Sequence, residues 1–126
     1  MIILDFINQA GAKNFRINQG EPFYYDIEVV GENDKPLNLS GYRAKMQVKK
    51  TPDTADTVVE VTAIIEDNKI KLELTKDQTA ALPVEGKKTW DDFEQYIYDL
   101  AIYKDNDFIR LLNGQFLVSP QVTKID

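Results

Sequence analysis

Apolar and polar residues alternate along much of the chain, and this period of two is typical of half-buried β-strands. The clearest example is residues 43–49, where Ala44, Met46 and Val48 are expected to face a core while the residues between them face water. The same alternation predicts strands over residues 23–29, 59–63, 70–74, 96–102 and 109–118. A broken form of it predicts two shorter strands over residues 2–7 and 14–17. The chain therefore has the periodicity of a β-protein.

Turn-forming residues separate the predicted strands. Asp67-Asn68 and residues 104–107 (KDND) are expected to form hairpin turns, because Asn and Asp tolerate the conformations that turns require. Residues 31–36 (GENDKP) predict a loop, since Gly and Asn accept positive φ and Pro does not fit a central strand. Gly114 predicts a β-bulge in the last strand, where a glycine often marks one.

One segment departs from the alternation. Thr75 and Gln78 have the spacing of a capping box, and Asp77 suits the first turn of a helix. Pro83 ends the segment because proline cannot continue a helix. We expect one short corner helix near residues 76–82, between two strands.

About eight short strands, with turn signals every eight to twelve residues and no alternation with helices, predict an all-β fold. The favoured architecture is an antiparallel β-sandwich of about 7–9 strands. A chain of 126 residues is long enough for one domain. Because no repeat or linker divides it, we expect residues 1–126 to form a single β-sandwich domain.

The composition excludes most familiar catalytic groups. The chain contains no Cys and no His, which excludes Cys/His zinc sites, thiol nucleophiles and histidine-dependent triads. Twenty-one Asp and Glu residues against fifteen Lys and Arg residues give a net charge of −6, so nucleic acid is not an expected partner. The apolar opening, residues 1–4, is far shorter than a membrane span. We expect neither an enzyme nor a membrane partner.

Acidic residues concentrate between Glu85 and Asp107, where seven carboxylates accompany three lysines. Asp105-Asn106-Asp107 lacks the Gly and the terminal Glu of an EF-hand loop, so a calcium site is not favoured. Pairs of carboxylates with glycosidase spacing are too numerous among the acids to discriminate. We therefore predict no catalytic residue, no metal and no cofactor.

Two charged features have alternative interpretations. Asp99 lies between apolar residues of a predicted strand, where a carboxylate needs solvent or a partner. We expect it to face outward or to pair with Arg110 across the hairpin. A basic stripe along residues 43–50, formed by Arg43, Lys45, Lys49 and Lys50, would either meet an acidic partner or form a solvated outer face.

The aromatic residues single out one loop. Trp90, the only tryptophan, and Phe93 lie in the polar stretch of residues 85–95 rather than in an alternating strand. A large ring exposed there would serve as an anchor for a protein partner or as a platform for a sugar. The alternative is that both rings fold back over an open end of the sandwich. We take Trp90 and Phe93 as the candidate partner-binding residues.

A series of short motifs carries a resemblance to a known group of proteins. The motifs are residues 20–23 (GEPF), 37–48 (LNLSGYRAKMQV), 74–75 (LT), 78–83 (QTAALP), 98–100 (YDL), 112–114 (LNG) and 118–123 (VSPQVT). In this order they resemble small phage and prophage proteins with an immunoglobulin-like sandwich, similar to the N-terminal domain of phage upper baseplate proteins. The resemblance covers about residues 19–123.

The resemblance implies a virion-associated structural or interaction protein of the tail, baseplate or head-tail region, without catalytic residues. Such a protein docks through loops and sheet edges onto other phage virion proteins or onto copies of itself. Its place would be the virion, or the cytoplasm of the bacterial host during assembly. The chain departs from the pattern at residues 84–95, which add the loop with Trp90. The alternative from the residues is a glycan-binding β-sandwich module that uses Trp90 and loop aromatics.

Overall fold

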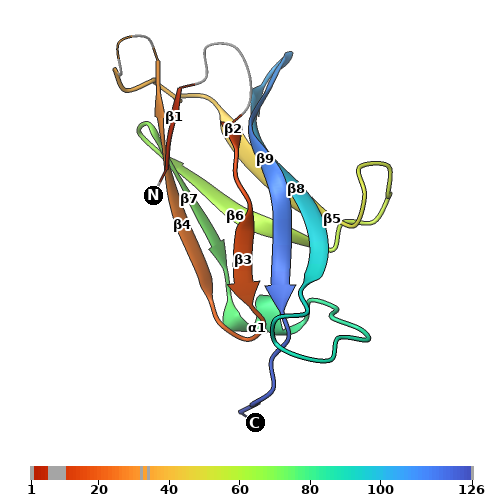
Figure 1. The fold of residues 1–126 in the computed structure, drawn as a ribbon. Coiled ribbons are helices and arrows are strands. Elements are labelled where there is room, and N and C mark those ends of the chain that lie inside the picture. Colours follow the sequence, from red (N-terminus) through yellow and green to blue (C-terminus); the bar gives the residue numbers. More distant parts are fainter. Residues whose placement is uncertain (1, 6–10, 32, 34, 126) are drawn as a thin grey trace.

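A computed structural model describes residues 2–5, 11–31, 33 and 35–125 (Figure 1). It contains the strands β1 (Ile2–Asp5), β2 (Gly11–Ala12), β3 (Phe15–Asn18), β4 (Phe23–Val30), β5 (Arg43–Lys49), β6 (Val59–Glu66), β7 (Lys69–Leu74), β8 (Glu94–Lys104) and β9 (Asp107–Ser119), with the helix α1 (Lys76–Ala80) after β7. The expected strand over residues 2–7 is found over Ile2–Asp5, and its last two residues lie outside the described part.

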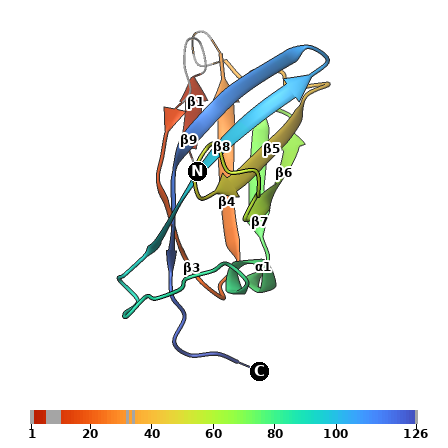
Figure 2. The ribbon, with the colours of Figure 1, turned by 90° about the vertical axis from the view of Figure 1, so that its right-hand side faces the viewer.

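The strands form two layers that share β6. Sheet A contains β1, β4, β7 and the second half of β6, whereas sheet B contains the first half of β6 with β5, β8, β9, β2 and β3. Val61 pairs with Met46 of β5, but Thr62, the next residue, pairs with Glu73 of β7. The sheet therefore curls at this step, and its two halves face each other as a sandwich (Figure 2).

The order of the strands is that of an immunoglobulin-like sandwich. β4, β7 and β6 in one layer and β5, β8 and β9 in the other correspond to the B-E-D and C-F-G sets of that fold. The expected all-β sandwich of 7–9 strands with one corner helix is confirmed. The N-terminal strands differ in direction, because β1 runs parallel to β4 and β3 runs parallel to β9. Neither has an adjacent hairpin partner that would impose an antiparallel pairing.

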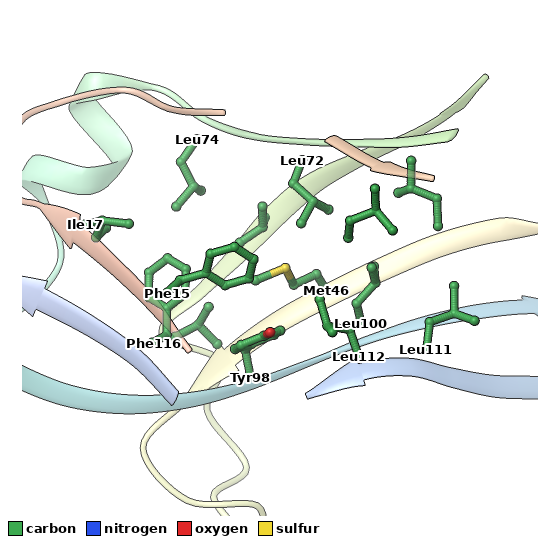
Figure 3. Close-up of a cluster of buried hydrophobic side chains, with 14 of the residues drawn as sticks. Phe15, Ile17, Met46, Leu72, Leu74, Tyr98, Leu100, Leu111, Leu112 and Phe116 are labelled. Carbon is green, nitrogen blue, oxygen red and sulfur yellow. The ribbon is translucent and has the colours of Figure 1, made fainter. Parts of the chain in front are cut away.

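The core lies between the layers and is filled by inward-facing residues of both (Figure 3). Met46, Leu72, Leu100 and Phe116 are fully buried or nearly so. Phe15 of the short β3 packs among aromatic rings, with its centroid 4.9 Å from that of Tyr25, 5.3 Å from Phe23 and 5.2 Å from Tyr98. Each large side chain buried in this way contributes about 1.5–3 kcal/mol to stability.

The corner helix begins where the sequence predicts. The Thr75 hydroxyl oxygen accepts a hydrogen bond from the backbone N–H of Gln78 at 3.2 Å, and the Gln78 side-chain oxygen accepts one from the N–H of Thr75 at 2.8 Å. Both halves of the capping box are thus present. The buried Thr79 hydroxyl donates to the carbonyl of Glu21 at 2.9 Å and ties the helix to the start of β4. In the described part of the chain, no helix has the length and apolar character that a membrane crossing requires.

A tyrosine fixes the path from the helix into β8. The Tyr96 hydroxyl donates a hydrogen bond to the carbonyl of Pro83 at 2.6 Å. A tyrosine at the start of this strand, bonded back to the upstream backbone, is the tyrosine corner of immunoglobulin-like sandwiches. Burial of the phenol raises the pKa of Tyr96 to about 12, with a further contribution from the charge of Glu94. The hydroxyl therefore stays protonated at neutral pH and can donate this hydrogen bond.

The irregularity in β9 is not at Gly114, as the sequence predicts. Gly114 pairs in register with Tyr98, whereas the extra residue is Leu111, because Leu112 lies opposite Leu100 and Arg110 lies opposite Ala101. Gly114 serves a close approach of backbones instead. A Cβ at this position would lie 2.0 Å from the carbonyl oxygen of Lys13. A glycine inside a strand marks either a bulge or such an approach, and here the second applies.

Candidate functional site

The loop of residues 84–93, here called the Trp90 loop, extends from the same end of the sandwich as the last described residues (Figure 1). Pro83 has no N–H with which to continue a helix or join a sheet. Gly86 has φ 72°, and a Cβ added to it would meet no atom within 4 Å, so glycine is required by the turn rather than by packing. Farther along, the Asp92 N–H donates to the carbonyl of Thr89 at 3.2 Å. The loop thus has defined turns of its own.

Charged residues fasten the base of the Trp90 loop to β8. The Lys50 ammonium lies 3.0 Å from the Glu94 carboxylate, and the Lys87 ammonium lies 3.6 Å from it. Lys87 also lies 3.9 Å from Asp92. Burial acts against ionisation of Glu94, but the hydrogen bond and charge of Lys50 and the charge of Lys87 together outweigh it and lower the pKa of this carboxyl. Glu94 therefore stays ionised between two cations at neutral pH.

Trp90 points away from the fold. Its side chain is 67% exposed, so it contributes little to the core. Its backbone is nevertheless attached, because the Ser119 hydroxyl donates to the carbonyl of Trp90. The loop therefore holds the main chain near the end of β9 while it presents the indole ring to solvent.

Phe93, the second candidate residue, has a different environment. It is half-buried, and the guanidinium of Arg16 lies 4.3 Å from the centroid of its ring. This is a cation–π contact between the Trp90 loop and β3. Of the two rings, Phe93 therefore folds back toward the sandwich and Trp90 does not. The partner-binding role of both residues stays a prediction.

The charged features that the sequence singled out do not converge on one centre. Among the described residues, no three acidic side chains are grouped so that they could hold a metal ion. Asp99 and Arg110 form no ion pair there, because the extra residue Leu111 places Arg110 opposite Ala101 and leaves Asp99 opposite Asn113. The expected pair is wrong, and the outward orientation of Asp99 is the one found. Of the four residues of the basic stripe, Lys50 forms an ion pair with Glu94.

A second surface feature was not predicted from the sequence. Residues of β5, β8 and β9, together with the turn between β8 and β9, line two adjoining hollows of about 370 and 520 Å³, here called the outer groove of sheet B. The lining residues are Lys45, Gln47, Lys49, Pro52, Ile97, Tyr98, Asp99, Ala101, Tyr103, Asp105, Asn106, Asp107, Phe108, Arg110, Asn113 and Gly114. The segment between β5 and β6 projects outward beside this face (Figures 1 and 2). Pro52 of that segment forms part of the lining.

Apolar and charged groups share the outer groove. Ala101 is only 3% exposed although it faces outward, whereas Phe108 is 69% exposed at the hairpin end. Lys45 and Arg110 flank Ala101 in register on either side, and neither makes an ion pair with any residue that the structure describes. Asp99 lines both hollows. The groove therefore offers cations, the half-buried carboxylate of Asp99, the exposed carboxylates of Asp105 and Asp107, and apolar surface to a binding partner.

The sequence contained one signal for this groove. Ile97, Ala101, Tyr103 and Phe108 are apolar residues at positions that alternation assigns to the solvent face. Four such residues gather only when β8 and β9 pair in the observed register. Grouped apolar residues on a solvent face are a mark of an interaction surface.

No protein-family model and no curated protein matches the chain. Among solved structures, the chain is similar to a mutant of the titin I27 domain, whose structure was determined in solution by NMR. The likeness covers 94% of this chain and 92% of that chain, with 13% identity and a TM-score of 0.39. At these values it carries no argument, and the immunoglobulin-like fold rests on the strand pairings described above.

Proposed function

We propose that the protein is a non-enzymatic docking module in which Trp90 anchors a protein partner. The observation that carries this proposal is the 67% exposure of an indole whose backbone is held to Ser119. A tryptophan on a pre-positioned loop buries a large area on binding and loses little side-chain entropy. The absence of Cys and His from the chain supports the non-enzymatic part.

The proposed setting is a phage or prophage particle, in its tail, baseplate or head-tail region. The support for this setting is the ordered series of motifs that resembles phage upper baseplate proteins. The partners would be other virion proteins and copies of the chain itself. The protein would accordingly be found in the virion, or in the cytoplasm of the bacterial host during assembly.

The arrangement of the aromatic residues favours a protein over a glycan as the partner. Sugar platforms combine several exposed rings, but Phe93 is covered by Arg16, and Tyr96 and Tyr98 are buried in the core. Trp90 is thus left without a second exposed ring beside it among these residues. Because it is the only tryptophan, a glycan panel that shifted its fluorescence would support the glycan-binding alternative instead.

The test compares two exposed aromatic residues. Trp90→Ala is expected to abolish incorporation into particles, whereas Tyr24→Ala, at a residue with the same 67% exposure on sheet A, leaves incorporation unchanged. Both variants should keep the stability of the wild type to within about 0.5 kcal/mol, as exposed substitutions do. Mass spectrometry of particles purified from the encoding organism measures the presence and copy number of each variant.

Three results would contradict the proposal. Absence of the wild-type chain from intact particles, with abundant protein in the lysate, would exclude a virion component. Normal incorporation of Trp90→Ala would exclude the anchor. A large loss of stability in Trp90→Ala would assign the ring to the fold rather than to a partner.

A further inference from the structure

We propose that the receptor for the Trp90 loop is the outer groove of sheet B on a second copy of this chain. The inference rests on the proposed role of Trp90 as an anchor and identifies what that anchor contacts. It joins two features of one molecule, the exposed indole of Trp90 and a groove lined by apolar and charged side chains. Copies would then associate loop-to-groove, each using its loop on one neighbour and its groove on another.

The larger hollow has the chemistry that an indole requires. Ile97 and Phe108 supply apolar surface, and Lys49 and Arg110 supply cations for the face of the ring. The indole N–H is a donor only and needs an acceptor when buried. The Asp99 carboxylate is half-buried in the same hollow and can accept it. A volume of about 520 Å³ leaves room for a large aromatic side chain.

The charges of the loop and of the larger hollow are complementary, because Lys49 and Arg110 line that hollow with a single carboxylate, Asp99, while Asp105 and Asp107 line the smaller hollow. Trp90 is followed directly by Asp91 and Asp92, and all three residues are exposed. Lys45, Lys49 and Arg110 of the groove form no ion pair with the described residues of their own chain. Lys87 of the loop, in contrast, is already engaged by Asp92 and Glu94. Docking would therefore bring the Asp91 carboxylate beside cations that form no ion pair with the described residues.

Trp90 does not line the groove of its own chain. The Trp90 loop lies at the end of the sandwich opposite the β8–β9 hairpin, which carries Phe108 (Figure 1). The exposure of Trp90 confirms that its ring is not seated in its own chain. Because each copy uses its loop on one neighbour and its groove on another, the contact is heterologous and generates a closed ring or an open filament.

The contact is expected to be weak between isolated copies. A buried aromatic side chain covers about 150–250 Å², whereas a stable interface buries about 800 Å² on each partner. Association should therefore increase across the range from about 1 μM to about 1 mM. Inside a particle, other contacts would hold the copies close enough to keep the grooves filled.

The first experiment uses Trp90 as the reporter. As the concentration of the wild-type chain rises, sedimentation should show oligomers, and tryptophan emission should shift to the blue as the indole leaves water. Trp90→Ala and the double variant Lys49→Glu/Arg110→Glu should stay monomeric. Lys69→Glu/Lys76→Glu, a double charge reversal at exposed residues away from the groove, is the matched control and should associate like the wild type. Circular dichroism checks that every variant is folded.

The second experiment mixes the two inactive variants. Trp90→Ala keeps an intact groove and is free of tryptophan, while Lys49→Glu/Arg110→Glu keeps an intact loop. The mixture should form heterodimers that grow no further, and the emission of the groove variant should shift only when the Trp90→Ala copy is added. An interface in which the same surface meets itself would not produce this complementation.

The outcomes separate this inference from the proposed function. A wild-type chain that stays monomeric with unchanged emission at about 1 mM would overturn the inference, as would self-association of Trp90→Ala at the wild-type level. If Trp90 is still required for incorporation into particles in that case, the anchor stands and its receptor is a different virion protein.

Discussion

The two faces of sheet B differ in how far their side chains are buried and paired within the chain itself. On β8 the inward residues Tyr96 and Tyr98 are buried, and both hydroxyls donate to backbone carbonyls, of Pro83 and Lys13. The outward residues Ile97 and Asp99 lie beside Lys49 and Arg110, which form no ion pair with the described residues, and beside the exposed ring of Phe108. The inward side chains of β8 are thus buried and hydrogen-bonded within the chain, whereas its outward side chains border charged and apolar groups that are open to a partner. The difference separates residues that maintain the fold from residues that are available to a partner.

The inner face is also complete in its polar groups. Within the described residues, no buried side-chain nitrogen or oxygen lacks a hydrogen-bond partner. Substitutions on this face should therefore lower the stability of the fold. Substitutions on the outer face should leave stability almost unchanged and act on association instead.

The largest effect should distinguish two phenylalanines of β9. Phe116→Ala removes a fully buried ring and is expected to cost about 3–5 kcal/mol in the free energy of unfolding. Phe108→Ala removes a ring that is 69% exposed and should change stability by less than about 0.5 kcal/mol. Urea unfolding measures both. Similar losses in the two variants would mean that the two faces do not differ as described.

A smaller effect is expected where the N-terminal backbone crosses β9. Gly114→Ala places a Cβ against the carbonyl of Lys13 and should destabilise the fold by about 1–3 kcal/mol, because backbone rather than a flexible side chain must move. Gly31→Ala is the control, since its nearest neighbour, the Leu37 side chain, lies at an ordinary 3.5 Å. Thermal unfolding of the two variants compares them, and an unaffected Gly114→Ala would exclude the close approach.

The tyrosines of the inner face should make stability depend on alkaline pH. Burial raises the pKa of Tyr96 to about 12 and raises that of Tyr98 as well, from an ordinary 10.0. The unfolded chain therefore releases these protons first, so stability is complete below pH 10 and falls as the pH rises toward 12.

Tyr98→Phe tests this dependence. It should lose about 1–3 kcal/mol at neutral pH, because the carbonyl of Lys13 loses its donor. Above pH 10 its stability should fall less steeply than that of the wild type. Tyr103→Phe, on the outer face, should match the wild type at neutral pH. Denaturant unfolding at several pH values measures both, and parallel curves for wild type and Tyr98→Phe would contradict the role of the buried phenol.

The smallest effect is expected at the boundary, where Glu94 joins the Trp90 loop to β8. Glu94→Gln should cost less than about 1 kcal/mol, because the partner Lys50 is 53% exposed and water weakens the pair. The folded-state pKa of Glu94 lies below the ordinary 4.5, so its contribution is present above that pH and is lost as the pH falls. The difference between wild type and Glu94→Gln in urea should disappear in acid. A constant difference down to pH 3 would show that charge is not responsible.

The sequence was sufficient to predict the elements that local pattern determines. In β5 the alternation assigned Met46 and Val48 to the core, and Thr75 with Gln78 located the helix start, because each signal lies within a few residues. The parallel pairing of β3 with β9 could not be predicted, since the paired residues lie about a hundred positions apart. The bulge was expected at the glycine, although the adjacent apolar pair Leu111-Leu112 contained the better signal.

The candidate sites divide in the same way. The loop with Trp90 was predictable because a tryptophan in a polar stretch departs from the strand pattern. The contact of Arg16 with the ring of Phe93 could not be predicted, because the two residues lie in segments that are distant in the sequence. The outer groove depends on the register of three strands, and the same register separates Asp99 from Arg110. Features that require pairing between distant residues appear only in the folded chain.

The parallel pairing of β3 with β9 also constrains when the protein can fold during its synthesis. Phe15 and Ile17, near the start of the chain, pair with Phe116 and Val118, which are among the last core residues to be translated. Until residue 119 has left the ribosome, the aromatic cluster has no complete partner, and the apolar faces of the earlier strands stay accessible to other nascent chains. The fold is thus completed after translation of β9 rather than strand by strand, and its yield in the cell should depend on chaperones that act at that moment.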